Sequence, residues 1–192
     1  MDVGNGRGTG INSFALVTYL SGPLADFLDE LRHDFGPDSR AKAHVTVLPP
    51  RQLTSSAPHA SAAWNALDEL KIRLQDFQPF RVEIGEIEVF PVTNVIYASI
   101  QVGYDELQRM HEVLNTGLVA FEEPYPYHPH VTIAQELAPQ DVAAAAAFAR
   151  WRWSEFRHSR SFMVERLTFV QDTLEKCWTD LATLDLSSQV IR

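Results

Sequence analysis

Hydrophobic and polar residues recur along this chain with two different periods, which predict its helices and strands. Apolar residues return every three to four positions in 24–35, 60–77, 105–121 and 139–151, as expected of helices with one buried face; in 60–77 the predicted buried stripe includes Trp64. Alternating or β-branched runs predict strands at 13–20, 42–48, 80–89, 95–102, 130–133, 162–171 and 178–186.

Three local signals refine the strands. The alternation shifts phase at Gly85-Glu86, which predicts a β-bulge. The turn residues 91–94 separate two strand patterns and predict a hairpin. Pro49 and Pro50 offer no backbone N–H to a strand ladder, so we expect the chain to leave the sheet there.

The order of elements repeats. One strand–helix–strand unit ends on the strand that begins near His44, and a second ends on the strand that begins at His130. This repeat predicts a pseudo-symmetric α+β fold. No linker rich in Gly or Ser separates the halves, so we expect residues 13–192 to form a single bilobal domain whose lobes share a cleft. Residues 1–12, rich in glycine, are predicted to be a flexible tail.

Two four-residue stretches carry the candidate chemistry. Residues 44–47 read His-Val-Thr-Val and residues 130–133 read His-Val-Thr-Ile. Random placement of the 7 His and 11 Thr would give only about 0.4 His-x-Thr triplets, so two with the same flanking pattern indicate a duplicated unit. In a strand, His and Thr two positions apart share one face while the aliphatic residues occupy the other.

Composition narrows the classes of function. The net charge of −9 disfavours a broad grip on duplex nucleic acid, which needs clustered Lys and Arg, but it allows a small nucleotide or an RNA end. The single Cys177 cannot form an intramolecular disulfide, and no apolar run is long enough to span a membrane. We expect a cytoplasmic protein without a membrane partner, in which Cys177 has a structural role.

Two histidines on one cleft suit phosphodiester chemistry. One imidazole can deprotonate the attacking water or hydroxyl while the other protonates the leaving oxygen, since both groups titrate near neutral pH. Thr46 and Thr132, on the same faces as His44 and His130, can donate hydrogen bonds to the phosphate oxygens. This scheme needs neither metal nor cofactor, and it predicts a metal-independent phosphodiesterase.

The motif pair resembles the twin His-x-Thr/Ser-x signatures of the two-histidine (2H) phosphoesterase superfamily, the 2′-5′ RNA ligase-like proteins, which include cyclic nucleotide phosphodiesterases. The resemblance extends over the element order across residues 13–186. It implies two lobes of antiparallel sheet lining a central cleft, with helices packed outside. It also implies that His44 and His130 are the catalytic pair and that Thr46 and Thr132 bind the phosphate. Implied substrates are 2′,3′-cyclic phosphates, 2′-5′ linkages, cyclic ADP-ribose phosphate or RNA 3′ ends.

Other side chains are candidates for substrate contact. Arg51 follows the first motif closely enough to overhang the cleft, and four aromatic residues are candidates for stacking on a base. These aromatic residues are Phe90, Tyr125, Tyr127 and Trp178. Four other histidines, which are neither in the motifs nor at position 128, are expected to be solvated. They are His33, His59, His111 and His158.

Two further functions stay open. A non-catalytic module could keep the cleft for binding a nucleotide or an RNA terminus, although binding alone does not require two proton carriers. A metal-dependent hydrolase could use His128 together with His44 and His130, although metal sites of this kind usually recruit a carboxylate or cysteine. The residues leave open the exact substrate, hydrolysis versus ligation, which histidine is the base, and the oligomeric state.

Overall fold

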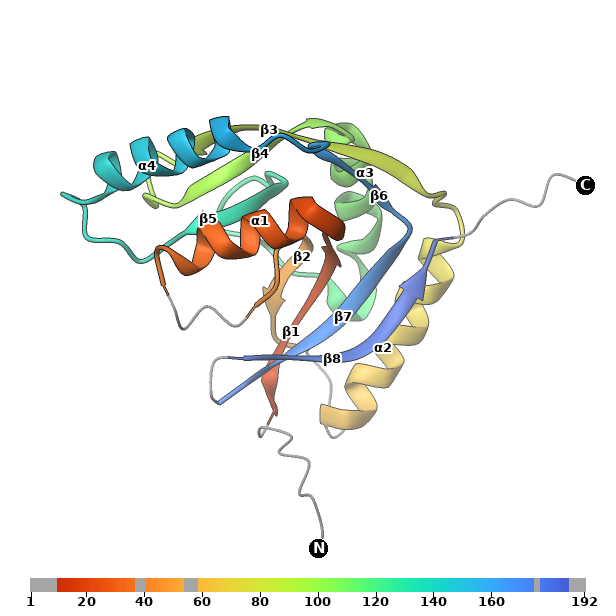
Figure 1. The fold of residues 1–192 in the computed structure, drawn as a ribbon. Helices are drawn as coiled ribbons and strands as arrows, with labels where there is room; N and C mark the ends of the chain where they lie inside the picture. Colours follow the sequence, from red (N-terminus) through yellow and green to blue (C-terminus); the bar gives the residue numbers. More distant parts are fainter. Residues whose placement is uncertain (1–9, 37–40, 54–58, 175–176, 187–192) are drawn as a thin grey trace, which may run out of the picture.

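A computed structural model describes residues 10–36, 41–53, 59–174 and 177–186, with the side chains of 59 and 60 excluded (Figure 1). The elements, in chain order, are β1 (Gly10–Tyr19), α1 (Gly22–His33), β2 (His44–Arg51), α2 (His59–Leu74), β3 (Phe80–Val89), β4 (Ile96–Val102), α3 (Tyr104–Leu114), the 3-10 turn η1 (Gly117–Val119), β5 (His130–Ala134), α4 (Val142–Glu155), β6 (Ser161–Val164), β7 (Arg166–Thr173) and β8 (Trp178–Asp185).

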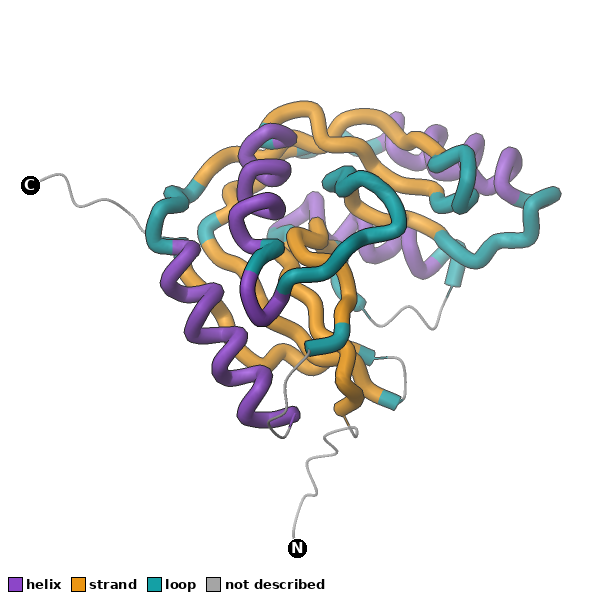
Figure 2. Tube along the Cα trace, turned by 180° about the vertical axis from the view of Figure 1, so that it is seen from behind, coloured by secondary structure: helices purple, strands orange, loops and turns teal. Residues whose placement is uncertain are grey.

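The described strands form two antiparallel sheets, which confirms the predicted α+β fold. One sheet has the order β2-β1-β7-β8 and the other has the order β5-β4-β3-β6. The helices connect the two lobes, because α1 packs against β5 of the second sheet while α3 packs against β2 of the first (Figure 2). Apolar residues from both sheets and all four described helices therefore share one large core.

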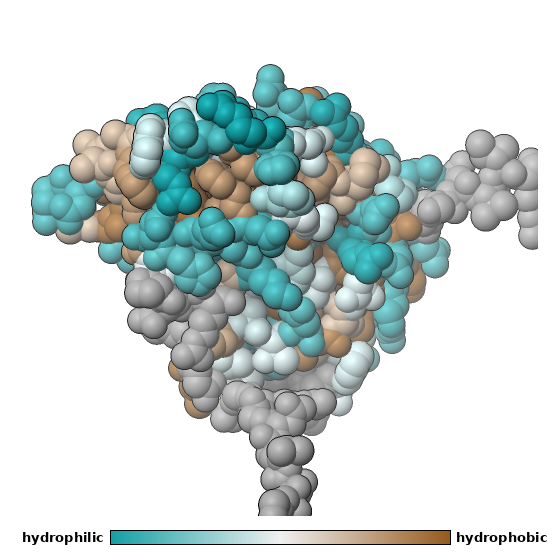
Figure 3. All heavy atoms as spheres, viewed as in Figure 1, coloured by the Kyte–Doolittle hydropathy of each residue, from teal (hydrophilic) through white to brown (hydrophobic). Residues whose placement is uncertain are grey.

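Hydrophobic side chains also show on the surface between α1 and α4 (Figure 3). The Phe27 ring of α1 lies 5.9 Å from Trp153 and 4.9 Å from Phe156, measured between ring centroids. These contacts hold the outer helices of the second lobe together, because buried aromatic pairs contribute both apolar area and favourable ring geometry.

The first strand begins earlier than the alternation predicts. β1 starts at Gly10, which pairs with Thr173 of β7, so residues 10–12 of the predicted tail belong to the sheet. The remaining tail, residues 1–9, lies outside the described residues. Long-range pairing with β7 orders a segment whose own composition gives no strand signal, which is why the sequence boundary was wrong.

β2 continues through the two prolines, contrary to the predicted exit. It extends to Arg51, which pairs with Phe14 of β1. β2 is an edge strand, and one side of an edge strand makes no ladder bonds, so prolines are tolerated there. The strand therefore continues past the motif and the prolines as far as Arg51.

The predicted strand 162–171 is two strands in different sheets. β6 pairs with β3, whereas β7 pairs with β1, and the chain crosses between the sheets at Glu165. The predicted helix 105–121 also ends early, at Leu114. Asn115 ends the helix, because its ψ of 52° is not helical, and Gly117 follows with φ of +62°, a left-handed conformation that favours glycine.

The predicted bulge and hairpin of the second sheet are confirmed. The pairing of β3 with β4 shifts between Ile84 and Ile87, and the hairpin turn contains Asn94 in the left-handed conformation. The bulge exposes backbone carbonyls that α4 satisfies, because Trp153 Nε1 donates to the Gly85 carbonyl at 2.9 Å. Burial of the Trp153 ring thus depends on the irregular strand.

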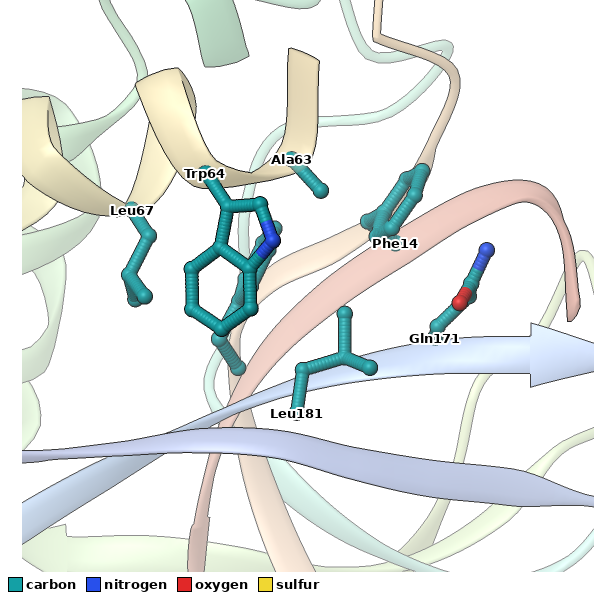
Figure 4. A pocket seen from close by; sticks show the side chains of 7 residues that line it. Phe14, Ala63, Trp64, Leu67, Gln171 and Leu181 are labelled. Atoms are coloured by element: carbon teal, nitrogen blue, oxygen red, sulfur yellow. The ribbon is translucent and has the colours of Figure 1, made fainter. Parts of the chain in front are cut away.

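Trp64 does not belong to the buried stripe of α2, contrary to the prediction. Its side chain is 58% exposed and covers a cavity of about 180 Å³ between α2 and the outer face of the first sheet (Figure 4). Leu67 and Phe14 line the same cavity from the helix and from β1. Trp64 lies on the predicted face of α2, but the helix and the sheet do not close around it, so its ring stays exposed.

Candidate active site

The two motifs lie on edge strands that face each other. β2 is the edge of the first sheet and β5 is the edge of the second, and the two strands pack together where the lobes meet. Residues 86 positions apart in the chain are thereby brought to one junction. The structure thus brings the two predicted motifs into one place.

Each motif strand pairs with its neighbour in the same register and has a bulge at the same position. His44, Val45, Thr46 and Leu48 pair with Tyr19, Thr18, Val17 and Leu16, which leaves Val47 as the extra residue. His130, Val131, Thr132 and Ala134 pair with Ser99, Ala98, Tyr97 and Ile96, which leaves Ile133 as the extra residue. The fourth residue of each motif is therefore a bulge that bends the strand directly after the threonine.

Both imidazoles are fixed by the same local hydrogen bond. His44 Nδ1 lies 2.6 Å from the Lys42 carbonyl, and His130 Nδ1 lies 2.6 Å from the His128 carbonyl. A carbonyl oxygen only accepts, so Nδ1 carries the hydrogen in both rings. In a neutral ring the other nitrogen, Nε2, is then an acceptor that can take a proton.

Aromatic rings surround each histidine. The Trp178 ring lies 4.8 Å from His44 between centroids, and Tyr19 presents its edge at 6.3 Å. Phe90 lies edge-on to His130 at 5.0 Å. Of the predicted aromatic residues, Phe90 and Trp178 thus lie beside the motif histidines.

Burial lowers the pKa of both histidines, so each ring stays neutral at a lower pH than it would in water. It lowers the pKa of His44 to about 4, although the bond to the Lys42 carbonyl opposes this. Positive charge on Arg32 and on His130 lowers the pKa of His44 further, which places His130 within electrostatic reach of His44. Burial also lowers the pKa of His130; the bond to the His128 carbonyl opposes this shift, and positive charge on the His128 ring adds to it.

Arg32 supports His44 through a shared acceptor. The Arg32 side chain is buried, and its Nη1 donates to the Lys42 carbonyl at 3.3 Å, the same oxygen that accepts from His44 Nδ1. Asp29 Oδ1 accepts the backbone N–H of Ala43 at 2.5 Å, which fixes the segment just before the motif. The α1 helix therefore positions the first histidine, a role that the sequence pattern did not indicate.

Arg51 is turned into the protein. Its side chain is 2% exposed and forms an ion pair with Glu123 at 2.8 Å. The guanidinium also donates to Asn115 Oδ1 at 2.6 Å and to the Val119 carbonyl at 2.9 Å. In this structure the predicted substrate contact is replaced by a connection between β2 and the segment that follows α3.

Tyr127 and Tyr125 differ in their surroundings. Tyr127 O–H donates to the Thr46 carbonyl at 2.8 Å, and its ring stacks on His111 at 3.9 Å between centroids. Burial raises the pKa of Tyr127, so the hydroxyl stays protonated as a donor. Tyr125 is 57% exposed. Tyr127 therefore supports the motif backbone, while Tyr125 lies at the surface.

His111 is buried, contrary to the predicted solvation. Its Nδ1 donates to the carbonyl of the bulged Val47 at 2.8 Å. It lies on the same helical face as the buried residues Leu107, Met110 and Leu114. That spacing in the sequence could have predicted its burial. His33 and His158 are exposed as predicted, and the side chain of His59 lies outside the described residues.

His128 lies beside His130 but makes its own contacts. The two rings are 6.5 Å apart between centroids, and His128 Nδ1 lies 3.3 Å from the Tyr104 hydroxyl. In the part of the chain that the structure describes, no group of three or more His, Cys, Asp or Glu side chains is arranged to hold a metal ion.

The described helices include none with the length and apolar character to cross a membrane.

Comparisons with known proteins identify relatives of the whole chain. Residues 20–175 match the family model of the 2′-5′ RNA ligase superfamily. A protein of Bacillus licheniformis, provisionally named a phosphoesterase, is 28% identical over 177 residues, which cover 91% of this chain and 99% of the relative. A protein of Bacillus cytotoxicus with the same provisional name is 26% identical over 175 residues, covering 89% and 95%.

Solved structures share the fold. The crystal structure of E. coli LigT complexed with 3′-AMP matches with a TM-score of 0.61 and 14% identity, covering 92% of this chain and 99% of LigT. A crystal structure titled as a phosphoesterase matches with a TM-score of 0.60 and 14% identity, covering 95% and 100%. At this identity the likeness concerns the fold alone.

Proposed function

The chain belongs to the 2′-5′ RNA ligase superfamily, and on this premise we propose that it is a metal-independent phosphodiesterase that uses His44 and His130 as general base and acid. The family and the names of the Bacillus relatives indicate a phosphoesterase. The observation that carries the finer proposal is the matched placement of the two imidazoles. Each is held by Nδ1 on a bulged edge strand, and charge on one is felt by the other.

His44 acts as the general base. Burial above all, and to a lesser degree the charge of Arg32, lowers the pKa of His44, so His44 is neutral at pH 7 and Nε2 can accept a proton from water or a hydroxyl. His130 acts as the general acid and protonates the leaving oxygen. A bound phosphodiester anion favours the imidazolium form of His130, since an opposite charge nearby raises a histidine pKa.

The threonines hold the phosphate. Thr46 and Thr132 are half-buried, each two residues after its histidine and on the same face of its strand. Hydroxyl donors at these positions fix the non-bridging oxygens and stabilise the charge that develops as the attacking oxygen adds. The bulge lies after each threonine, so His and Thr of each motif keep the regular strand spacing that puts them on one face.

The substrate is a small nucleotide or an RNA 3′ end, with a 2′,3′-cyclic phosphate or a 2′-5′ linkage as the reacting group. LigT, which shares the fold, was crystallised with 3′-AMP, and this supports a nucleotide of that size. The Trp178 and Phe90 rings beside the two histidines can stack on a base. The net charge of −9 favours such a substrate over duplex nucleic acid.

A substrate panel tests this function. Purified protein is assayed with 2′,3′-cyclic nucleotides, 2′-5′ dinucleotides and cyclic ADP-ribose phosphate, with and without EDTA, and the products are identified by chromatography. We expect turnover of at least one phosphodiester at a rate that EDTA does not change. Loss of turnover on chelation would assign the protein to metal-dependent hydrolases, and tight binding without turnover would make it a binding module.

A further inference from the structure

A cavity of about 420 Å³ lies next to the candidate active site on the second sheet. Its lining comes from β3, β4, α3 and the segment before β5: Gly85, Glu86, Glu88, Ser99, Ile100, Gln101, Tyr104 and His128. The volume lies within the range of roughly 300–1,000 Å³ that is usual for small-molecule sites. It is therefore large enough to be considered as part of the binding site.

The cavity lies on the same face of the sheet as the catalytic ring. Ser99 in its wall is the direct cross-strand partner of His130, so both side chains point to one side. His128, also in the wall, has its ring 6.5 Å from that of His130. The cavity therefore borders the His130 ring on the same face of the sheet, within reach of a group esterified to a phosphorus atom beside that ring.

The charge of the lining is negative. Glu86 and Glu88 supply two carboxylates, and none of the lining residues is Lys or Arg. Glu86 is paired with Arg160 at 3.3 Å, and Glu88 Oε2 accepts from Tyr97 O–H at 3.0 Å. A hydroxyl donor does not neutralise a carboxylate, so the charge of Glu88 in particular is available to repel an anion.

The other polar groups suit an uncharged ligand. The Gln101 amide can both donate and accept, and the Glu88 carboxylate can accept from sugar hydroxyls or amino groups. The Tyr104 hydroxyl accepts from Gln108 Nε2 at 3.1 Å and lies 3.3 Å from His128 Nδ1, which holds both wall residues in place. These groups offer hydrogen bonds to a nucleoside, and the lining itself holds no Lys or Arg that would bind a phosphate.

We propose that this cavity is the subsite for the uncharged nucleoside portion of the substrate, and that its carboxylates select against a second phosphate there. The proposal rests on the proposed function, because it assumes that the reacting phosphate lies between His44 and His130. It narrows the proposed substrates: a nucleoside with one phosphate at its 2′ or 3′ position is preferred over the same nucleoside with another phosphate at the 5′ position. A small nucleotide is therefore favoured over an RNA 3′ end, whose terminal nucleoside carries a 5′ phosphodiester.

Binding of two product-like ligands tests the proposal. Isothermal titration calorimetry compares adenosine 3′-monophosphate with adenosine 3′,5′-bisphosphate. We expect the wild-type protein to bind the monophosphate at least about tenfold more tightly, because like charges brought together across a binding site are strongly disfavoured. In the variant Glu86→Gln/Glu88→Gln this ratio should fall to within about threefold.

A charge-matched control separates the local effect from net charge. Glu83→Gln/Glu165→Gln removes two carboxylates that do not line the cavity, and it should keep the wild-type ratio. In wild-type protein, raising the salt from about 0.05 M to about 0.5 M should also reduce the ratio, since salt screens exposed charges. This second measurement does not depend on whether the double variant folds.

The outcomes distinguish the two proposals. Equal affinity of the wild-type protein for the two ligands, or a ratio that neither salt nor the carboxylate variant changes, would overturn the nucleoside subsite while leaving the phosphodiesterase function intact. Failure of the wild-type protein to bind adenosine 3′-monophosphate, together with no turnover of any phosphodiester, would overturn the function and the subsite together.

Discussion

His111 Nδ1 donates to the carbonyl of Val47 at 2.8 Å, and Val47 is the residue that bulges from the first motif strand. A bulge leaves a backbone group without its ladder partner, and an unpaired buried carbonyl is costly. The imidazole on α3 supplies the missing donor. One side chain of the second lobe thus stabilises the irregular strand that carries His44 in the first.

Replacing His111 tests this support. His111→Phe keeps a ring to stack on Tyr127 but leaves the Val47 carbonyl unpaired, so the free energy of unfolding should fall by about 1–3 kcal/mol and kcat should fall with it. Tyr127→Phe removes only the bond to the Thr46 carbonyl and should cost about 0.5–1.5 kcal/mol. Urea denaturation and steady-state kinetics measure both effects. His158→Phe, at an exposed position, serves as the control, and equal stabilities of all these proteins would contradict the assignment.

Arg51 has a structural role in this account. In Arg51→Met the Glu123 carboxylate loses its buried partner, so the free energy of unfolding should fall by about 3–5 kcal/mol. Arg51→Met/Glu123→Gln should recover part of this loss, because the stranded charge is removed. Urea denaturation provides the measurement. A single variant of unchanged stability whose KM rises sharply would instead show that Arg51 contacts the substrate.

The pH dependence follows from the direction of the two histidine shifts. In the proposed mechanism the base His44 must be neutral, and its pKa is about 4, so kcat/KM should fall as the pH drops through about 4. The acid His130 must be protonated and has a pKa below its ordinary value of 6.5, so kcat/KM should also fall as the pH rises toward neutrality. The predicted profile is a bell with its maximum between these limits. A plateau that extends above pH 8 would be incompatible with this pair.

Arg32 should set the acidic limb. In Arg32→Met the positive charge beside His44 is gone, so the pKa of His44 should rise, whereas Arg32→Lys should keep it low. Titration of the imidazole signals by NMR measures this pKa without any substrate. Arg157→Met, an exposed arginine at the end of α4, is the matched control. An unchanged pKa in Arg32→Met would show that burial alone lowers it.

Local sequence patterns predicted most of the architecture. The alternation, helical stripes and twin motifs predicted most of the element order and the strands that carry both motifs, because these signals arise from the residues themselves. The boundaries that were wrong depend on distant partners: Gly10 is ordered by β7, and the split at Glu165 exists because β6 and β7 pair with different sheets. No local period reports which sheet a strand joins.

The two motif histidines were predictable from the sequence, whereas the residues that hold the motif strands in place were not. The motifs predicted His44 and His130 because chemistry and strand period coincide there, and the two motif strands pack together; the catalytic role of both residues stays a prediction. Arg32 and His111 were missed because each sits on a helix far along the chain from the motif that it holds. The burial of Arg51 was not predictable for the same reason, since its partner Glu123 is 72 positions away.

The most direct test of the account is the turnover of the best phosphodiester substrate by His44→Ala, His130→Ala and the double variant. If the two imidazoles act as one acid–base pair, each single variant should lose at least about 10²-fold in kcat with folding intact, and the double variant should lose little more than either single variant. Circular dichroism confirms folding, and His33→Ala, at an exposed position on α1, controls for histidine removal. Single variants that retain turnover within about threefold of the wild-type protein would contradict the central claim.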